Sequence, residues 1–305
     1  MFDQVAFIGV GLIGSSMARA IKERSLSKTL IGYDANNEVC TRIKELGIVN
    51  EAAPSLEVAC KGADLIIIST PVGTAEKTLG AIASAAEKDA IIIDVGSVKG
   101  NVVDVAAKLA SQGHIVPCHP ISGTEKSGPD AGFGSLFEDR WCIITPLKRS
   151  DAPYLQSVEK TASLWRALGS NVEMMDAGHH DLALAVTSHL PHLIAFTLVG
   201  AADDLENVSE SEIVKYSAGG FRDFTRIAAS NPIMWRDVFL HNKDAVLEVL
   251  GRFTEELTVL QRAIRWGDAE TLEASFARGR ELRRAIVDAG QETEAANFGR
   301  DNETP

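Results

Sequence analysis

The chain has 305 residues and a formal net charge of −12, from 30 Lys and Arg against 42 Asp and Glu. So acidic a chain lacks the positive field that would hold a polyphosphate backbone, which excludes non-specific nucleic-acid binding. Hydrophobic residues make up 45% and charged residues 24%, which excludes wholesale disorder and predicts a large core in about two domains.

The first half of the chain alternates short runs rich in Ile and Val with segments of helical period. This alternation predicts a Rossmann-type α/β fold, a doubly wound parallel sheet covered by helices on both faces. The predicted strands are residues 5–8, 29–33, 65–69, 90–95, 115–118, 141–145 and 172–175. The predicted helices between them are residues 13–24, 38–46, 75–86, 102–111 and 154–168.

The first predicted strand runs directly into a GxGxxG motif, formed by Gly9, Gly11 and Gly14 at the start of a helix. In a dinucleotide site these glycines permit a tight turn, the approach of a pyrophosphate and close packing of helix on strand. Asp34 follows at the end of the second strand, where a carboxylate can accept hydrogen bonds from both ribose hydroxyls and would repel a 2′-phosphate.

The motif therefore predicts NAD in preference to NADP. The alternatives are a glycine turn without a ligand and a site for another adenosine ligand, such as a methyl donor. Further cofactor contacts are expected from Leu12, Ile13, Ser69, Thr70, Pro71 and Ser97.

Polar residues follow the predicted strands 90–95 and 115–118. Ser97 and Lys99 come after the first strand, and His119 comes after the second. Ligands of open α/β sheets bind beyond the carboxyl ends of strands, so we expect these residues near the nicotinamide end of the crevice. Ser97 and His119 form a candidate proton-transfer pair, although a strand-end histidine before a proline is also compatible with a purely structural role.

Beyond residue 176 the chain becomes helical, with apolar residues at spacings of three and four. We expect a dinucleotide-binding domain over residues 1–177, an all-α domain for substrate binding and dimerisation over 178–290, and a polar tail over 291–305. One apolar seam in the second domain would face another helix of the same chain or of a second subunit: Val246, Leu250, Phe253, Leu257, Leu260 and Ile264.

Two pairs of residues in the helical half invite a binding role. Arg222 and Arg226 lie four apart and would share one helical face, from which a guanidinium can bind a carboxylate through two hydrogen bonds. His189 and His192 lie three apart in an apolar helix. No glutamate follows His189 as in HExxH, so we expect no metal site, and hydrogen-bonded core histidines are the alternative.

Five motifs make the chain resemble the prephenate, arogenate and cyclohexadienyl dehydrogenase family of tyrosine biosynthesis. They are GVGLIGSS at 9–16, DVGSVKG at 94–100, HPISGTEKSG at 119–128, SHLPH at 188–192 and GGFRDFTRIA at 219–228. The resemblance implies an NAD-dependent oxidative decarboxylation, of prephenate to 4-hydroxyphenylpyruvate or of arogenate to tyrosine. Hydride leaves the ring carbon that bears the hydroxyl, and carbon dioxide leaves the opposite ring position.

The resemblance also implies roles for single residues. It makes His119 the acceptor of the hydroxyl proton, with Ser97 hydrogen-bonded to that hydroxyl or to the imidazole. It makes Arg222 and His189 substrate contacts and leaves Arg226 between a substrate contact and a structural role. Two residues of the loop after His119 are expected at the substrate, Thr124 and Glu125, and the latter would gate the site, link to Arg222 or pair with the amino group of arogenate.

Two other readings share part of this pattern. A β-hydroxyacid dehydrogenase or an imine reductase also joins a Rossmann domain to a helical one, but would not explain the motifs at 119–128 and 219–228. A redox-sensing protein would bind NAD without turnover. For the enzyme, a homodimer formed through the helical domain is expected.

The cellular location is predicted from three features. The chain has four cysteines without CxxC spacing, typical of reduced thiols: Cys40, Cys60, Cys118 and Cys142. Asp3 stands where a signal peptide would carry positive charge. The apolar stretch 182–199 is interrupted by Pro191 and two histidines, short of an uninterrupted membrane span. We expect a cytoplasmic protein without membrane contact.

Overall fold

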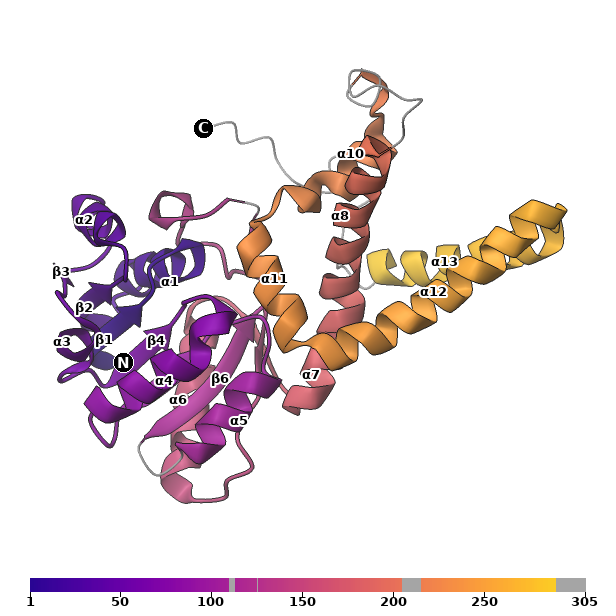
Figure 1. The fold of residues 1–305 in the computed structure, drawn as a ribbon. Coiled ribbons are helices and arrows are strands. Elements are labelled where there is room, and N and C mark those ends of the chain that lie inside the picture. Colours follow the sequence, from indigo (N-terminus) through magenta and orange to yellow (C-terminus); the bar gives the residue numbers. More distant parts are fainter. Residues whose placement is uncertain (110–112, 125, 205–214, 289–305) are drawn as a thin grey trace. The chain divides into compact units, whose positions relative to one another are not determined.

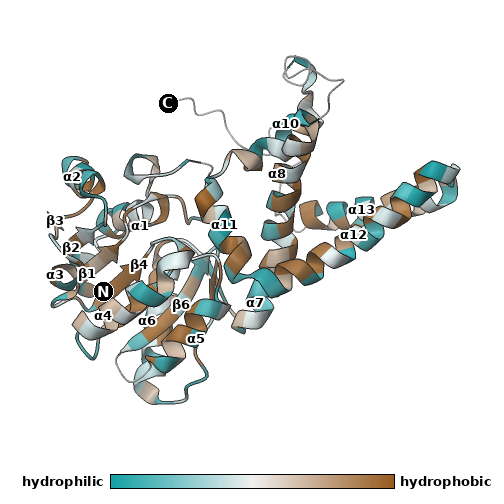
Figure 2. Ribbon diagram, in the orientation of Figure 1, coloured by the Kyte–Doolittle hydropathy of each residue, from teal (hydrophilic) through white to brown (hydrophobic). Residues whose placement is uncertain are grey.

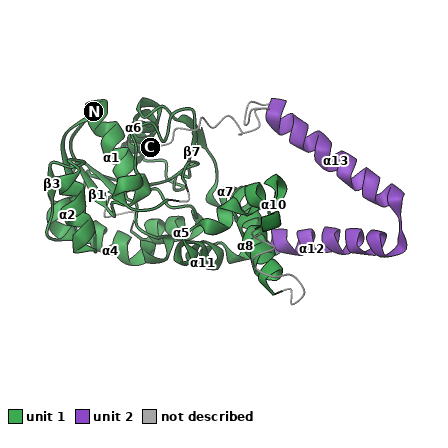
Figure 3. Ribbon diagram, turned by 90° about the horizontal axis from the view of Figure 1, so that it is seen from above, with its two compact units in different colours: residues 1–247 green, residues 248–305 purple. Residues whose placement is uncertain are grey.

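The protein was analysed as a computed structural model, which describes residues 1–109, 113–124, 126–204 and 215–288 (Figure 1). Contacts divide the chain into two compact units, residues 1–247 and 248–305, coloured separately in Figure 3. Glu125 and the tail expected over 291–305 lie outside the described residues. The predicted boundary at residue 177 stays a prediction, because the division between the units falls within a later helix.

The described strands of unit 1 form a single eight-stranded sheet in the order β3-β2-β1-β4-β5-β6-β7-β8. Their bounds are β1 Phe2–Ile8, β2 Ser27–Tyr33, β3 Glu51–Ala52, β4 Leu65–Ile68, β5 Ile91–Asp94, β6 His114–Pro120, β7 Trp141–Ile144 and β8 Asn171–Met174. The strand order reverses between β1 and β4, which makes the carboxyl ends of these strands the topological switch point where α/β sheets bind ligands. The predicted Rossmann-type fold is confirmed.

Buried strands and covering helices explain the stability of this sheet. Every residue of β4 and β5 is buried, as expected where helices cover both faces. In Figure 1, α4 and α5 lie side by side in front of the strands, and α6 lies behind them. The helices of this part are α1 Leu12–Glu23, α2 Asn37–Glu45, α3 Leu56–Cys60, α4 Ala75–Ala85, α5 Gly100–Lys108 and α6 Ala152–Ala167.

The strand β7 departs from the expected parallel arrangement. It runs antiparallel to β6, with Cys118 opposite Ile144, whereas the other pairs of the sheet are parallel. The described chain between β6 and β7 contains only a 3₁₀ turn, Pro129–Ala131, and no crossover helix of the kind that a parallel connection requires. The short β3 and α3 also escaped the sequence analysis, because two and five residues show no measurable period.

The helical region after the sheet begins with a nearly continuous run. It consists of α7 Ala177–Leu184, a π-helical turn Ala185–His189 and α8 Leu190–Asp203. Pro191 has no N–H for the helical ladder, and its ring crowds the carbonyl of the preceding turn, which accounts for the wider turn before it. The later elements are α10 Gly219–Thr225, a 3₁₀ turn Arg226–Ala229, α11 Pro232–His241, α12 Lys243–Trp266 and α13 Ala269–Asp288.

The run of residues 177–203 is, by length and composition, apolar enough to cross a membrane. The prediction that Pro191 and the two histidines interrupt a span is wrong for the backbone, because the helix continues through all three residues. The same test is passed by core helices of soluble proteins, and this one carries the buried polar residues His180, Asp181 and His189. Only 28% of its most apolar stretch is buried within the chain, and Figure 2 shows the hydrophobic colouring of α8.

Candidate active site

A tight glycine turn joins β1 to α1. Gly9 has φ +83°, a left-handed conformation that favours glycine, and a Cβ there would lie 2.8 Å from Thr70 Cγ2. A Cβ on Gly14 would lie 2.6 Å from the Gly9 carbonyl oxygen. Ser69 closes the turn from β4, because its hydroxyl donates to that same carbonyl at 2.5 Å. The predicted cofactor residue Ser69 therefore holds the turn itself in shape.

The residues at this turn fit a dinucleotide. Gly11 stands at the N-terminus of α1, where no side chain caps the helix, and a Cβ on it would meet nothing within 4 Å. The free amides of this first turn are a binding site for a pyrophosphate. Asp34 accepts hydrogen bonds from the backbone N–H of Val10 at 3.0 Å and of Asn36 at 2.9 Å, so its carboxylate is fixed beside the glycine turn. Leu12 and Ile13 are half-buried beside the turn, as is Thr70, whereas Pro71 is exposed.

The substitution Asp34→Asn tests the choice of cofactor. Loss of the carboxylate removes a charged acceptor for the ribose hydroxyls and the repulsion of a 2′-phosphate, so we expect KM for NAD to rise about 10–100-fold. The preference for NAD over NADP should narrow in the same variant. Steady-state kinetics with both dinucleotides measure the two effects, and a wild-type protein that prefers NADP would refute the charge argument.

His119 lies near the carboxyl end of β6, whose neighbour in the sheet is β5. Its Nδ1 lies 2.8 Å from Nε2 of His180. Protein atoms surround the ring closely, although part of the residue reaches solvent. This desolvation is the main cause that lowers the pKa of His119 well below 6.5, and the charges of His180, Lys99 and His189 lower it further. A neutral imidazole at neutral pH is the form that accepts a proton.

The ring of His180 connects His119 to a carboxylate that the sequence analysis did not identify. His180 is fully buried, and its Nδ1 lies 2.8 Å from Oδ1 of Asp181. Asp181 accepts the backbone N–H groups of Lys99 at 2.9 Å and of Gly100 at 2.8 Å, at the start of α5. The signal available in the sequence was a polar His-Asp pair in an otherwise apolar stretch.

Lys99 serves the interior of the protein rather than the crevice where we expected it. Its side chain is fully buried, forms an ion pair with Asp94 and donates to the carbonyl of Cys118 at 2.7 Å. It thereby ties the end of β5 to the residue before His119. Ser97, in the same turn, is half-buried. The ring partner that the structure gives His119 is His180, and a bond from Ser97 stays a prediction.

His189 presents a donor within the described part of the site. It is 1% exposed, and its Nδ1 accepts from the amide nitrogen of Asn242 at 3.0 Å, which leaves the proton of the neutral ring on Nε2. That Nε2 is buried without a hydrogen-bond partner among the described residues. Burial lowers the pKa of His189 to about 4, so the ring is neutral. An unpartnered buried N–H is the group that a polar ligand atom would satisfy.

His192 takes the structural alternative. Its Nδ1 lies 2.8 Å from the carbonyl oxygen of Ser188, and its ring stacks on Trp235 with centroids 3.7 Å apart. Across the described residues, no group of three or more His, Cys, Asp and Glu side chains is arranged to hold a metal ion.

The two arginines do not share a regular helical face. Arg222 is exposed on α10, which ends at Thr225, and Arg226 begins the following 3₁₀ turn. The charge of Arg226 is among the causes that lower the pKa of His192, after burial, so this arginine lies near that ring. Thr124 is exposed, and its hydroxyl accepts the N–H of Lys126 at 3.2 Å. Among the described residues, the hydrogen bonds of His119 and Thr124 do not join them to each other or to Arg222, and the roles of Arg222 and Thr124 stay predictions.

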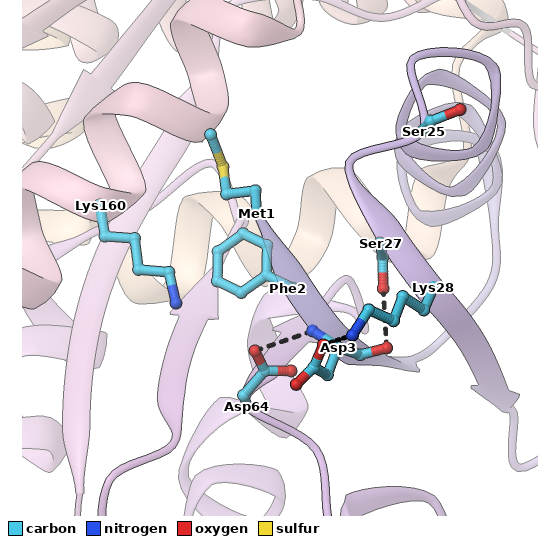
Figure 4. Close-up of a pocket in the computed structure, with 8 residues that line it drawn as sticks. All are labelled: Met1, Phe2, Asp3, Ser25, Ser27, Lys28, Asp64 and Lys160. Atoms are coloured by element: carbon cyan, nitrogen blue, oxygen red, sulfur yellow. Dashed lines mark hydrogen bonds and ion pairs between the residues drawn. The ribbon is translucent and has the colours of Figure 1, made fainter.

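A separate hollow lies at the amino ends of β1 and β2 (Figure 4). Its wall includes Asp3, Lys28 and Asp64, and Lys28 is paired with Asp3 at 2.6 Å. Asp64 accepts the backbone N–H groups of Asp3 and Gln4. These groups satisfy one another at the edge of the sheet opposite the glycine turn and His119, so this hollow is not the candidate active site.

Comparison with known proteins gives matches along most of the chain. The family described as "Prephenate dehydrogenase, nucleotide-binding domain" matches residues 17–174, and "Prephenate dehydrogenase, dimerization domain" matches residues 176–278. The chain is 40% identical to a cyclohexadienyl dehydrogenase of Zymomonas mobilis over 94% of this chain and 97% of the relative. It is 37% identical to a prephenate dehydrogenase of Bacillus subtilis, over 93% and 76%.

A solved structure agrees with these relatives. The crystal structure of prephenate dehydrogenase from Aquifex aeolicus, in complex with hydroxyphenyl propionate and NAD+, superposes with a TM-score of 0.83 at 34% identity. The match covers 94% of this chain and 99% of that one.

Proposed function

The chain belongs to the prephenate dehydrogenase family, and on that premise we propose that it oxidatively decarboxylates prephenate, arogenate or both, with His119 as the proton acceptor. The observation that carries the proposal is a neutral, half-buried imidazole at the carboxyl edge of a sheet of the dinucleotide-binding type. The β-hydroxyacid dehydrogenase, imine reductase and NAD-sensing readings are not favoured, because the family matches extend through both halves of the chain.

The residues of this chain divide the chemistry among them. Gly9, Gly11, Gly14 and Asp34 would hold NAD, which would supply the acceptor for the hydride on the ring carbon bearing the hydroxyl. His119 takes the proton of that hydroxyl as the carbonyl forms. His189 offers its buried Nε2–H to a polar atom of the substrate. No acid is needed for the carboxylate that departs as carbon dioxide, since aromatisation of the ring drives its loss.

An assay of the purified protein with NAD tests this function. We expect the absorbance of NADH to appear with prephenate or with arogenate, together with one equivalent of carbon dioxide. The ratio of kcat/KM for the two compounds then identifies the preferred substrate. A protein that binds NAD and yields NADH with neither compound would contradict the proposal and favour a sensor.

Arg222 is proposed to bind a substrate carboxylate. In Arg222→Gln the bidentate, charge-assisted pair is lost, so we expect KM for the substrate to rise about 10–100-fold with a small change in kcat. The exposed Arg236 of α11 offers a control, since Arg236→Gln should leave KM unchanged. An effect of Arg222→Gln confined to kcat would show that ground-state binding is not its role.

We also propose that the protein is a homodimer formed through its helical region. Large apolar side chains are exposed in each unit taken by itself. In the helical region of unit 1 they include Leu182, Val186, Leu198 and Val199, and in unit 2 they include Leu257, Ile264, Trp266, Phe276 and Leu282. In the predicted apolar seam, Val246 is buried within the chain, whereas Leu257 and Ile264 are 52% and 67% exposed. The exposed end of the seam supports contact with a second subunit. Sedimentation equilibrium measures the assembly.

We also propose that the protein is located in the cytoplasm. The cysteines Cys60, Cys118 and Cys142 are free and buried, and Cys40 is free and partly buried. These free thiols support a reducing, cytoplasmic environment.

A further inference from the structure

Three side chains form a hydrogen-bonded series that ends at the proposed proton acceptor. Asp181 Oδ1 lies 2.8 Å from His180 Nδ1, and His180 Nε2 lies 2.8 Å from His119 Nδ1. The first two residues are neighbours on α7, and His119 reaches them from β6. All three residues of the series belong to unit 1.

The direction of each proton follows from the donors around Asp181. Backbone N–H groups of Lys99 and Gly100 point at its two oxygens, and such groups can only donate. Asp181 therefore acts as an acceptor toward His180, whose Nδ1 must carry a proton. A neutral His180 then has its lone pair on Nε2, because a neutral imidazole carries a single N–H.

The same rule applies to the next ring. His180 Nε2 accepts, so the Nδ1 of His119 must donate to it. A neutral His119 consequently has an unprotonated Nε2, the nitrogen that is not engaged with His180. Burial keeps both rings neutral at neutral pH. It lowers the pKa of His119 well below 6.5, and it lowers the pKa of His180 from 6.5 although Asp181 acts in the opposite direction.

We propose that Asp181, acting through His180, holds His119 as the Nδ1–H tautomer and so leaves Nε2 ready to accept the substrate proton. His180 and Asp181 are positioning residues in this scheme, since neither needs to touch the substrate. When Nε2 of His119 gains a proton, the Nδ1–H bond to His180 is already in place, so the series does not have to rearrange. The inference rests on the proposed role of His119, but the tautomer itself can be measured without turnover.

Nitrogen NMR of the wild-type protein gives the direct test. With ¹⁵N-labelled histidine rings, protonated and unprotonated ring nitrogens have well-separated shifts, and His119→Asn assigns the His119 signals. We expect a protonated Nδ1 and an unprotonated Nε2 for His119 at neutral pH. The opposite tautomer in the wild-type protein would overturn the proposal, whatever the effect of any substitution at His180.

Two substitutions of His180 separate its contacts. The short side chain of His180→Asn can reach Asp181 but not His119, whereas His180→Gln can place an amide oxygen near His119 Nδ1. We expect His180→Asn to move His119 toward the Nε2–H tautomer and to lower kcat about 10²–10³-fold, with substrate KM and NAD affinity nearly unchanged. His180→Gln should keep the Nδ1–H tautomer of His119, and its kcat should be about tenfold higher than that of His180→Asn.

The neighbouring His179 is exposed and supplies a matched control, because His179→Asn should alter neither the tautomer nor kcat. A folded His180→Asn protein in which His119 keeps its tautomer would contradict the inference. A tautomer shift with unchanged kcat would instead leave the inference on the tautomer standing and remove His119 from the proposed reaction.

Discussion

Replacing the proposed proton acceptor in His119→Asn will lower kcat by about 10²–10⁴-fold, the usual contribution of a general base. Asparagine is similar in size and keeps a polar group near His180, but it has no nitrogen that accepts a proton at neutral pH. NAD affinity should stay nearly intact, because the glycine turn and Asp34 bind at a different strand end. Stopped-flow absorbance measures kcat, and calorimetry measures the affinity for NAD.

The pH dependence of the wild-type protein gives an internal control. The active form is neutral His119, and its pKa is lowered well below 6.5, mainly by burial. Lowering the pH adds the inhibitory proton, so kcat should hold steady from about pH 7 upward and fall on the acid side, below the ordinary histidine range. The residual activity of His119→Asn should not show this fall of kcat at low pH. Unchanged turnover in this variant would remove His119 from the mechanism.

Replacing the buried lysine in Lys99→Met will destabilise the protein by about 3–5 kcal/mol. Lys99 is fully buried and Asp94 is 4% exposed, so loss of the ammonium group leaves a carboxylate without its counter-charge inside the sheet. The Cys118 carbonyl loses a donor at the same time. Urea titration measures the loss in the free energy of unfolding, with the unfolding transition monitored by circular dichroism and by tryptophan fluorescence.

Two further variants show whether the unpaired carboxylate is the cause. Lys108→Met removes an exposed lysine from α5, the helix that Lys99 precedes, and should change stability by less than about 0.5 kcal/mol. The double substitution Asp94→Leu with Lys99→Met replaces both charges by apolar groups. In other proteins such a replacement often leaves the stability unchanged, so the double variant should recover much of the stability that Lys99→Met loses. A double variant as unstable as Lys99→Met would point to the lost tie to Cys118 instead.

The cofactor half of the site was predictable because its residues act through local spacing. Gly9, Gly11 and Gly14 are needed at fixed steps along one turn, and Asp34 ends the adjacent strand, so a short stretch of sequence contains the whole pattern. The role of Ser69 was only partly anticipated. Its hydroxyl donates a hydrogen bond to the carbonyl of Gly9, 60 residues away. The periodicity of a strand does not predict which distant turn the side chain after that strand contacts.

The sequence by itself determined the alternation of strands and helices, the glycine turn and the position of His119 close to the end of a buried strand, because these depend on periods of two and 3.6 residues and on short motifs. The strand itself extends two residues further than predicted and includes His119. Only the tertiary structure revealed the antiparallel β7, the burial of Lys99 against Asp94 and the series from Asp181 through His180 to His119. The N–H of Lys99 meets Asp181 across 82 residues of chain, and His119 meets His180 across 61. Hydrophobic periodicity indicates which side of a helix is buried, whereas the partner of a buried polar atom is decided by how distant elements dock together.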